Sequence, residues 1–480
     1  MKFKISIIIV CLFAVTSCTD DFTEINTNPN APVEVEPSLL LRNVLWESGE
    51  KLSWEGFVAG SLLAQQIALI DFNNFDRHDL TGVQFGGNPW PILYTLMRDN
   101  EIILEQSRAN PAYAKYEGPA LILKTYLAGI TTDLFGDIPY FEAVSGKSGV
   151  VSPAYDSQED IYNSTNGLLD NLEKGIAAIQ ATSGNNTLAF DGDILYGGNL
   201  NNWVKFANSL KIKYLMRMSD VGTSVNLKLQ TIYDEGNYIK TPEQNATFDF
   251  STAQPNNFRM ATARAGDFQV FVMALTMEEV LKNLNDPRIE VFFRPTANTP
   301  TAYQGTLNGP NTAETPVNAG DVSFAGTIFR ERTGDLDANF MTSFETNLLL
   351  AEAAERGLLF EPAQPLYEMG VTQAFEYWGA TMPTDYLTAG DAAYGTNPLE
   401  QIATQKWIAN IGNGYESWID WRRTGFPALK TISASLNNDL IPVRMPYPNT
   451  EAALNTVNYN AAASATNDNS VNAKVWWDVN

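Results

Sequence analysis

Apolar residues recur at helical spacing along most of this 480-residue chain. They stand about three, four or seven positions apart, which gathers them on one face of an α-helix and leaves polar residues on the other. The stripes comprise Leu93, Leu96, Met97, Ile103 and Leu104; Ala120, Leu123, Leu127, Ile130 and Leu134; Leu168, Leu172, Ile176 and Ile179; Trp203, Phe206, Ala207, Leu210 and Tyr214; Phe344, Leu348, Ala351 and Leu358; and Tyr367, Val371, Ala374 and Trp378. We expect an amphipathic helix at each stripe, and therefore a mostly α fold whose helices bury their apolar faces against one another.

Short breaks join several of these helices into neighbouring pairs. Residues 357–365, which begin with Gly357 and end with Pro365, separate the helix near Phe344 from the one near Tyr367. Such pairs are typical of tetratricopeptide-like helical hairpins, but the strict repeat of about 34 residues is missing, so a degenerate version is predicted. Strand-like runs are few and short, at 290–294 and 327–330.

The first 17 residues have the features of an export signal. Lys2 and Lys4 flank the start of an apolar run over 5–15, which is much shorter than the roughly 20 residues that a membrane-spanning helix needs. The residues that follow, up to Ser17 and Cys18, resemble a bacterial lipoprotein cleavage box. We therefore predict a signal peptide at 1–17 and lipidation of Cys18, which would anchor the protein to a membrane without spanning it. Ordinary secretion with cleavage near Ser17 is the alternative.

A polar stretch rich in Asn, Thr and Pro follows Cys18. Residues 18–37 contain too few apolar side chains to pack, so we expect a lipidated tether there and a single helical binding domain at 38–480. Asp20 and Asp21 resemble the acidic signal that directs lipoproteins of Bacteroidetes-type bacteria to the outer surface. The only other cysteine lies inside the predicted signal peptide, so the mature chain is expected to contain no disulfide.

The chain is strongly acidic, with a formal net charge of −24. Its 31 Lys and Arg residues are far outnumbered by 55 Asp and Glu residues. Electrostatic repulsion makes nucleic acid and anionic lipid headgroups poor partners for such a protein. Acidic charge also keeps a surface protein soluble, so the charge alone indicates no specific function.

Residue types for common catalytic chemistry are scarce. His78 is the only histidine, so no zinc site built on two histidines can be assembled, and a Ser-His-Asp triad would have to use this residue. It sits in a polar segment, where we expect a solvated loop histidine. Asp191-Gly192-Asp193 lacks the later acids of a calcium loop and favours a turn. No catalytic residue, metal or cofactor is predicted, but a glycosidase-like carboxylate pair stays open because a linear sequence does not reveal the separation that it requires.

The most distinctive segment lies near the C-terminus, over residues 401–429. One helical face carries four large apolar residues, Trp407, Ile411, Tyr415 and Trp418. The Gly-Asn-Gly sequence at 412–414 marks a turn or a helix interruption. Arg422 and Arg423 would end the helix, where cations favour its dipole, and Gly425 would stop it.

This segment resembles the SusD/RagB family, surface lipoproteins that work beside TonB-dependent transporters. Its most telling part runs Glu416-Ser417-Trp418-Ile419-Asp420-Trp421-Arg422-Arg423-Thr424-Gly425-Phe426-Pro427. Other agreeing segments are 134–140, 203–216, 345–356 and 475–478, so the resemblance covers nearly the whole mature chain in the expected order. It implies that five tryptophans pack the common scaffold, namely Trp407, Trp418, Trp421, Trp476 and Trp477.

The resemblance implies an α-helical scaffold whose irregular loops and small strands form the ligand face. Members of the family bind glycans, or in some cases peptides, at the cell surface, cap a SusC-like TonB-dependent transporter barrel, and have no catalysis of their own. We therefore expect a lipid-anchored protein of the outer membrane, facing the exterior, that binds a nutrient oligomer, with a glycan as the first choice. A peptide ligand, an all-α surface glycoside hydrolase and an adhesin are the alternatives.

Two long segments interrupt the helical pattern, at 67–90 and 296–340, and long irregular segments in a domain are usually functional. Aromatic side chains suit the apolar faces of sugar rings, whereas amide, carboxylate and guanidinium groups suit the hydroxyls. The candidate aromatic contacts are Phe72, Phe75, Phe85, Trp90 and Tyr303. The candidate polar contacts are Asn73, Asn74, Asp76 and Arg77. The alternative is that the aromatic residues anchor the loops, and Trp90, at the start of an apolar helix, is the strongest case for a core residue.

Overall fold

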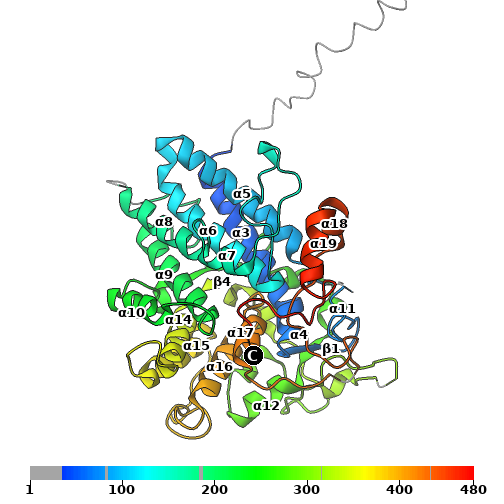
Figure 1. Ribbon diagram of the computed structural model, residues 1–480. Coiled ribbons are helices and arrows are strands. Elements are labelled where there is room, and N and C mark those ends of the chain that lie inside the picture. Colours follow the sequence, from blue (N-terminus) through cyan, green and yellow to red (C-terminus); the bar gives the residue numbers. More distant parts are fainter. Residues whose placement is uncertain (1–34, 82–84, 183–186, 315, 433, 480) are drawn as a thin grey trace, which may run out of the picture.

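The computed structural model describes residues 35–479, except 82–84, 183–186, 315 and 433. Helices dominate it and the strands are short (Figure 1). The predicted mostly α fold is therefore confirmed. The predicted signal peptide, Cys18 and the tether as far as residue 34 lie outside the described residues, and helix α3 begins at Pro37.

The longer helices form the scaffold, and each predicted stripe lies on one of them apart from two residues at stripe ends. They are α3 (Pro37–Glu55), α5 (Trp90–Ala109), α6 (Glu117–Phe135), α8 (Leu168–Ala181), α9 (Leu200–Arg217), α10 (Val225–Glu235), α14 (Ser343–Glu355), α15 (Ala363–Tyr377), α16 (Pro398–Ala409) and α17 (Glu416–Thr424). The shorter helices are α4 (Ser61–Leu63), α7 (Gln158–Asn163), α11 (Ala265–Phe268), α12 (Leu275–Asn283), α13 (Ile289–Phe292), α18 (Asn449–Leu454) and α19 (Thr456–Ala465). Two stripe residues fall just outside their helices, because α14 ends before Leu358 and α15 ends before Trp378.

Neighbouring helices pack against one another as the predicted hairpins. Helix α5 packs on α6, α6 on α8, and α8 on α9; farther along the chain, α14 packs on both α15 and α16. The break between α14 and α15 falls at 356–362 and overlaps the predicted one at 357–365. The buried apolar side chains of these helices form one main core and a small satellite beside it, because each helix covers the apolar face of its neighbour.

Two small antiparallel sheets complete the fold. Strand β1 (Ile67–Leu69) pairs with β3 (Phe271–Met273), so that Ala68 lies opposite Val272. Strand β2 (Ala246–Asp249) pairs with β4 (Asp337–Met341), so that Phe248 lies opposite Ala338. Each sheet joins segments that are far apart in the sequence.

The strands predicted at 290–294 and 327–330 are wrong. Residues 289–292 form the single-turn helix α13, and residues 327–329 form a 3-10 turn. Phe293 makes only an isolated bridge with Ala325. Apolar runs this short fit a helical turn as well as a strand, and in either form their phenylalanines Phe292 and Phe329 can be buried, as they are here.

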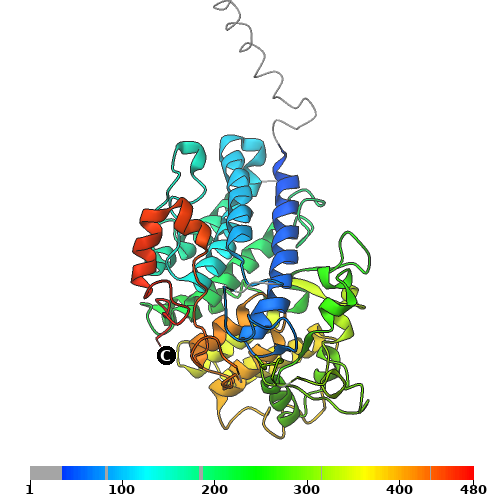
Figure 2. The same ribbon diagram turned by 90° about the vertical axis from the view of Figure 1, so that its right-hand side faces the viewer.

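A close backbone contact divides the predicted C-terminal helix into α16 and α17. Helix α3, upright and dark blue in Figure 2, continues into a π-helical turn over Gly56–Gly60. A Cβ atom on Gly60 would lie 2.0 Å from the carbonyl oxygen of Gly414, so only glycine lets the 412–414 turn approach this closely. The turn therefore interrupts the helix, and Trp407 and Trp418 lie on two different helices.

The five tryptophans assigned to packing do lie in or against the core. Trp407, Trp418 and Trp477 are at most 2% exposed, and Trp421 and Trp476 are partly buried against the main core. The indole N–H of Trp407 donates to the carbonyl of Ala64 at 3.0 Å, and that of Trp418 to the carbonyl of Pro442 at 3.0 Å. These bonds connect the C-terminal helices to other parts of the chain.

Candidate ligand-binding site

The predicted ligand segment forms a tightly anchored loop, which we call the aromatic loop (residues 71–81 and 85–87). Asp76 holds it in place, because its carboxylate accepts hydrogen bonds from the backbone N–H of Leu69 at 3.0 Å and of Gly309 at 2.8 Å. The amide of Asn308 donates to the other carboxylate oxygen at 2.6 Å. Burial raises the pKa of Asp76 to about 6 in spite of these donors. Asp76 therefore joins the loop to β1 and to the second irregular segment.

Three further predicted contacts also point inward. Asn73 donates from its side-chain amide to the carbonyl of Pro310 at 2.6 Å, and the ring of Phe75 lies directly against Gly87. Trp90 is 5% exposed and meets Phe135 edge to face at 4.8 Å between ring centroids. Together with Asp76, these side chains support the loop from inside. Their role as ligand contacts stays a prediction, and as placed here these buried and paired groups could reach a ligand only by rearrangement.

His78 is buried, so the prediction of a solvated histidine is wrong. Its side chain is covered by the segment 434–440, and Nδ1 lies 3.1 Å from the carbonyl oxygen of Leu440. Since a carbonyl only accepts, Nδ1 carries the proton in this contact. Burial lowers the pKa of His78 to about 4, so the imidazole is neutral at pH 7.

Phe72 and Phe85 are the aromatic residues of the loop that reach its surface. Phe72 is 53% exposed, and its ring meets that of Phe85 edge to face at 6.4 Å. Phe85 in turn packs on Phe271 of β3 at 5.4 Å. The indole N–H of Trp54 donates to the carbonyl of Phe85 at 2.9 Å, so the end of α3 holds the backbone of this residue. The pair presents apolar surface on a rigid support.

Polar groups and two unpredicted leucines lie on the aromatic loop and on the segment 434–440, which contacts the loop at Arg77 and His78. Asn74 is exposed, and Arg77 is half-buried with Nε donating to the carbonyl of Ala434 at 2.8 Å. Leu436, whose N–H donates to the carbonyl of Arg77 at 2.6 Å, is 48% exposed, and Leu440 is 52% exposed. Both leucines interrupt a polar stretch near residue 435, a signal that the sequence did contain.

Tyr303 belongs to the second irregular segment rather than to the aromatic loop. It is half-buried and packs against the main core. Among the described residues no ring contact joins it to Phe72 or Phe85. The candidate contacts of the aromatic loop that are at least partly exposed are Phe72, Asn74, Arg77 and Phe85, and of these Phe72 and Phe85 are in ring contact.

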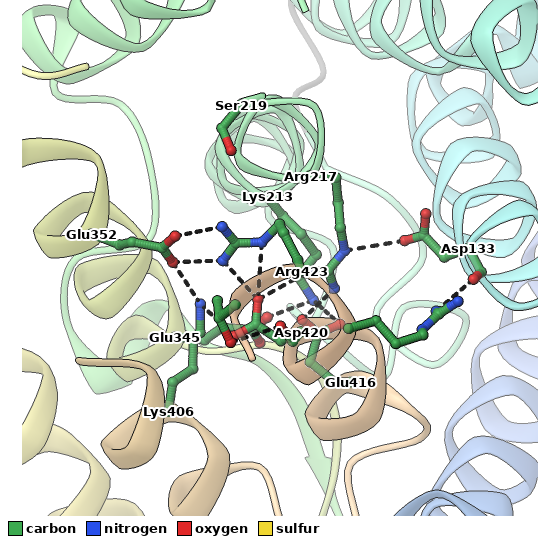
Figure 3. A network of polar contacts seen from close by, with 12 residues as sticks. Asp133, Lys213, Arg217, Ser219, Glu345, Glu352, Lys406, Glu416, Asp420 and Arg423 are labelled. Atoms are coloured by element: carbon green, nitrogen blue, oxygen red, sulfur yellow. Dashed lines mark hydrogen bonds and ion pairs between the residues drawn. The ribbon is translucent and has the colours of Figure 1, made fainter. Parts of the chain in front are cut away.

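A cluster of charged side chains lies inside the scaffold, apart from the aromatic loop, and we call it the ion network (Figure 3). Its members are Asp133, Lys213, Arg217, Glu345, Glu352, Lys406, Glu416, Asp420 and Arg423, whose side chains are at most 10% exposed. Arg217 pairs with Glu416 at 2.5 Å and with Asp420 at 3.1 Å. Asp420 also pairs with Lys406 at 2.9 Å. The network thereby ties α6, α9, α14, α16 and α17 together.

The electrostatics of the ion network indicate a structural role. Burial alone would raise the pKa of Glu352, but Arg423 and Lys406 outweigh it and hold the pKa at about 2. Glu345 differs, because burial outweighs its contact with Lys213 and raises its pKa to about 6. The adjoining cavity holds about 30 Å³, which is room for little more than water. No substrate could reach these carboxylates without opening the scaffold.

The described residues contain no group of three or more His, Cys, Asp or Glu side chains that could hold a metal ion. Asp191-Gly192-Asp193 forms a turn, and the carboxylate of Asp193 is occupied by other donors, among them the indole N–H of Trp203 at 2.9 Å. None of the helices formed by the described residues combines the length and apolarity that crossing a bilayer requires.

Comparison with known proteins identifies the family. Residues 29–448 match the model of a SusD-like family that is described as starch-binding and associating with the outer membrane. The chain belongs to the SusD-like family. No curated protein sequence matches this SusD-like protein.

Solved structures share the fold of this SusD-like protein. A chitin-binding protein has 26% sequence identity and a TM-score of 0.77, with 93% of this chain and 100% of that chain covered. A SusD homologue from Bacteroides uniformis has 24% identity and a TM-score of 0.77, with 92% and 99% covered. A chitin-binding SusD homologue from Flavobacterium johnsoniae has 22% identity and a TM-score of 0.76, with 92% and 98% covered.

The end of the C-terminal segment that carried the resemblance is confirmed. Arg422 and Arg423 lie in the last turn of α17, and the helix ends at Gly425 as predicted. Both arginines are also buried, which the sequence did not predict. Arg422 donates to the carbonyl of Asp133 at 2.6 Å, and Arg423 pairs with the carboxylate of Glu352. In this SusD-like protein they join α17 to other helices.

Proposed function

We propose that this SusD-like protein binds a nutrient glycan at the cell surface and presents it to a TonB-dependent transporter of the outer membrane. The family match over residues 29–448 carries the proposal. The family is described as starch-binding, and two of the similar structures are described as chitin-binding. Neutral glycans are therefore the first ligands to test.

The aromatic loop supplies chemistry that suits a sugar. The exposed ring of Phe72, supported edge-on by Phe85, offers an apolar platform for the C–H face of a pyranose. Asn74 and Arg77 lie on the same loop and can pair with hydroxyl groups. Because Asp76 and Trp54 already fix the loop, binding would not have to order it, which lowers the entropic cost of association.

Calorimetric titration of the mature protein with starch- and chitin-derived oligosaccharides tests this site. Phe72→Ala should weaken binding about tenfold, because it removes the platform and about 1.4 kcal/mol of contact energy. Phe360→Ala is the matched control, since Phe360 is 76% exposed on the connection between α14 and α15. Binding of oligopeptides in place of glycans would favour the peptide alternative, and cleavage of the glycan would favour a hydrolase.

The anchor and the partner need separate experiments. Cys18→Ala should abolish incorporation of labelled fatty acid and release the protein from the membrane fraction, because no acyl chain would hold it there. Affinity purification of the tagged full-length protein from gently solubilised outer membranes should bring a large barrel protein in stoichiometric amount. Reproducible absence of such a barrel would contradict the transporter role and favour a free-standing adhesin.

A further inference from the structure

A separate cavity lies along α3, away from the aromatic loop. It holds about 770 Å³ between the first turns of α3, the turn at 190–197 and the end of β2 with the residues after it. Trp46 lines this cavity, whereas Trp54 of the same helix holds the aromatic loop. Eight residues of α-helix separate the two by about 12 Å along the axis. The cavity is therefore distinct from the site at Phe72, and its volume is typical of small-ligand sites.

An indole ring forms one wall of this cavity. Trp46 is half-buried, and its ring stacks on Phe248 with centroids 5.3 Å apart and planes 30° apart. Phe250 contacts the same indole edge to face at 6.0 Å. These contacts fix the orientation of Trp46 while part of it stays open to solvent. A fixed, partly exposed indole is a suitable platform for an apolar ring face.

Phe190 stands at the rim of the cavity on a rigid turn. It is 76% exposed, so its ring contributes little to the core. The turn is held by Asp193, whose carboxylate accepts from the backbone N–H of Tyr196 at 3.1 Å and of Gly198 at 3.0 Å. A Cβ atom on Gly197 would lie 2.9 Å from the ring of Phe190, so the glycine lets the ring lie against the turn. The fold thus places an exposed aromatic ring at the rim of the cavity, on a turn that hydrogen bonds hold.

Short polar side chains complete the lining. Asn43 and Asn256 are both exposed there, and within the described residues neither carboxamide takes part in a side-chain hydrogen bond. Arg42 donates to the backbone carbonyl of Asp191 at 2.8 Å, which joins α3 to the turn. Free carboxamides beside aromatic rings match the alternation of hydroxyl groups and C–H faces on a sugar.

The charge of the lining excludes anionic ligands. Among the described lining residues Arg42 is the one cation, against the carboxylates of Asp191, Asp193 and Asp249. A nucleotide or an acidic lipid headgroup would meet net negative charge. We infer that this cavity is a second binding site for a neutral saccharide, with Trp46 and Phe190 as ring platforms and Asn43 and Asn256 as hydroxyl partners. The inference shares the ligand class of the proposed function but does not depend on the aromatic loop.

The test separates the two sites by substitution. Neutral oligosaccharides that bind the mature protein are titrated against wild type, Phe72→Ala, Phe190→Ala and the doubly substituted protein. Phe190→Ala removes an exposed ring and should leave folding intact, with Phe360→Ala as a control of equal exposure, 76%. Asn43→Ala, on the exposed face of α3, is the second variant. Hydroxyl-radical footprinting of Trp46 and Phe190 reports whether the ligand covers the cavity.

We expect two binding events in wild type and one in Phe72→Ala. In Phe72→Ala the ligand should still protect Trp46 and Phe190 from hydroxyl radicals, and adding Phe190→Ala should weaken that remaining event at least fivefold. If Phe190→Ala and Asn43→Ala both bind like Phe360→Ala and Trp46 is never protected, the second site is refuted while the first stands. Loss of binding in Phe190→Ala but not in Phe72→Ala would support the cavity and refute the aromatic loop. Failure of every neutral glycan to bind wild type would refute both.

Discussion

The ion network and the aromatic loop both bury carboxylates, but they satisfy them in different ways. In the ion network, carboxylates such as Asp420 pair with cations from other helices. In the aromatic loop, Asp76 pairs with backbone N–H groups and an amide, and no cation takes part in these bonds. The first arrangement fixes helices relative to one another, whereas the second fixes one loop so that Phe72 can face solvent. The comparison teaches that the side chains that connect the helices are different from those proposed to bind the ligand.

The largest loss of stability is expected when a charge is removed from the ion network, and this tests the structural role that the comparison assigns to it. Asp420→Asn should lower the free energy of unfolding by about 3–5 kcal/mol, because it leaves Lys406, Arg217 and Arg423 facing a neutral amide in a buried site. Urea unfolding measures the change. Asp335→Asn, in an exposed pair with Arg332, is the matched control and should cost less than about 1 kcal/mol. Equal effects of the two substitutions would contradict a structural role for the network.

The pKa of His78 tests the burial of the aromatic loop. Because this is the only histidine, NMR titration of the tag-free protein follows its imidazole directly. We expect a midpoint near pH 4 in the folded protein, as burial lowers the pKa, and near 6.5 in urea, where the chain is unfolded. A folded-state midpoint near 6.5 would show that the segment 434–440 does not cover the ring.

The same pKa has a consequence for stability. Between pH 6.5 and 4 the unfolded chain binds a proton at His78 that the folded chain does not, so this residue destabilises the fold by roughly 3 kcal/mol as the pH falls through that window. Asp76 acts in the opposite direction, because its folded pKa of about 6 favours the folded state as the pH falls from 6 toward 3.8. His78→Gln should therefore make the protein more stable relative to wild type at pH 4 than at pH 7, as denaturant unfolding at the two pH values would measure. A pH-independent difference would contradict this linkage.

A smaller effect is expected where α3 meets the C-terminal turn. Gly60→Ala should cost about 1–3 kcal/mol, because the added methyl would overlap the backbone of Gly414 and the two segments would have to move apart. Gly146→Ala is the control, since nothing lies within 4 Å of the Cβ that it would add. Thermal and urea unfolding of both variants measure the difference. Unchanged stability of Gly60→Ala would show that the turn can shift freely.

The smallest effect on stability is expected at the proposed binding surface. Phe72→Ala should change the free energy of unfolding by less than about 0.5 kcal/mol, because half of the side chain is already exposed. Its urea midpoint should match that of Phe360→Ala while its glycan affinity falls. A large loss of stability in Phe72→Ala would mean that the ring belongs to the core, and the division between the two regions would no longer hold.

Sequence reasoning predicted the helices well and the site only in part. Stripes such as Leu93, Leu96 and Leu104 lie on α5 and are buried, because local periodicity reports which face of a helix is apolar. The described part of the irregular segment at 67–90 did contain one exposed aromatic residue, Phe72, and the half-buried Phe85. Which of its aromatic residues would be exposed could not be predicted, because Phe72 and Phe75 are three residues apart and differ only in what covers them.

The ion network could not be predicted from the sequence. Arg217 and Glu416 are 199 residues apart, and each alone looks like an ordinary polar residue of an amphipathic helix. The burial of His78 could not be predicted for the same reason, since the segment that buries it lies about 360 residues farther along the chain. The cavity at Trp46 likewise combines three distant segments.

The sequence by itself determined the mostly α fold, the helical hairpins and the family, because these follow from periodicity and from motifs within short stretches of chain. The tertiary structure alone decided which charges are buried, which aromatic rings face solvent and which segments meet at a cavity. The physical reason is that burial and pairing depend on contacts between residues far apart in the chain. A residue such as Asp76 is an exposed acid or a buried anchor according to what packs around it.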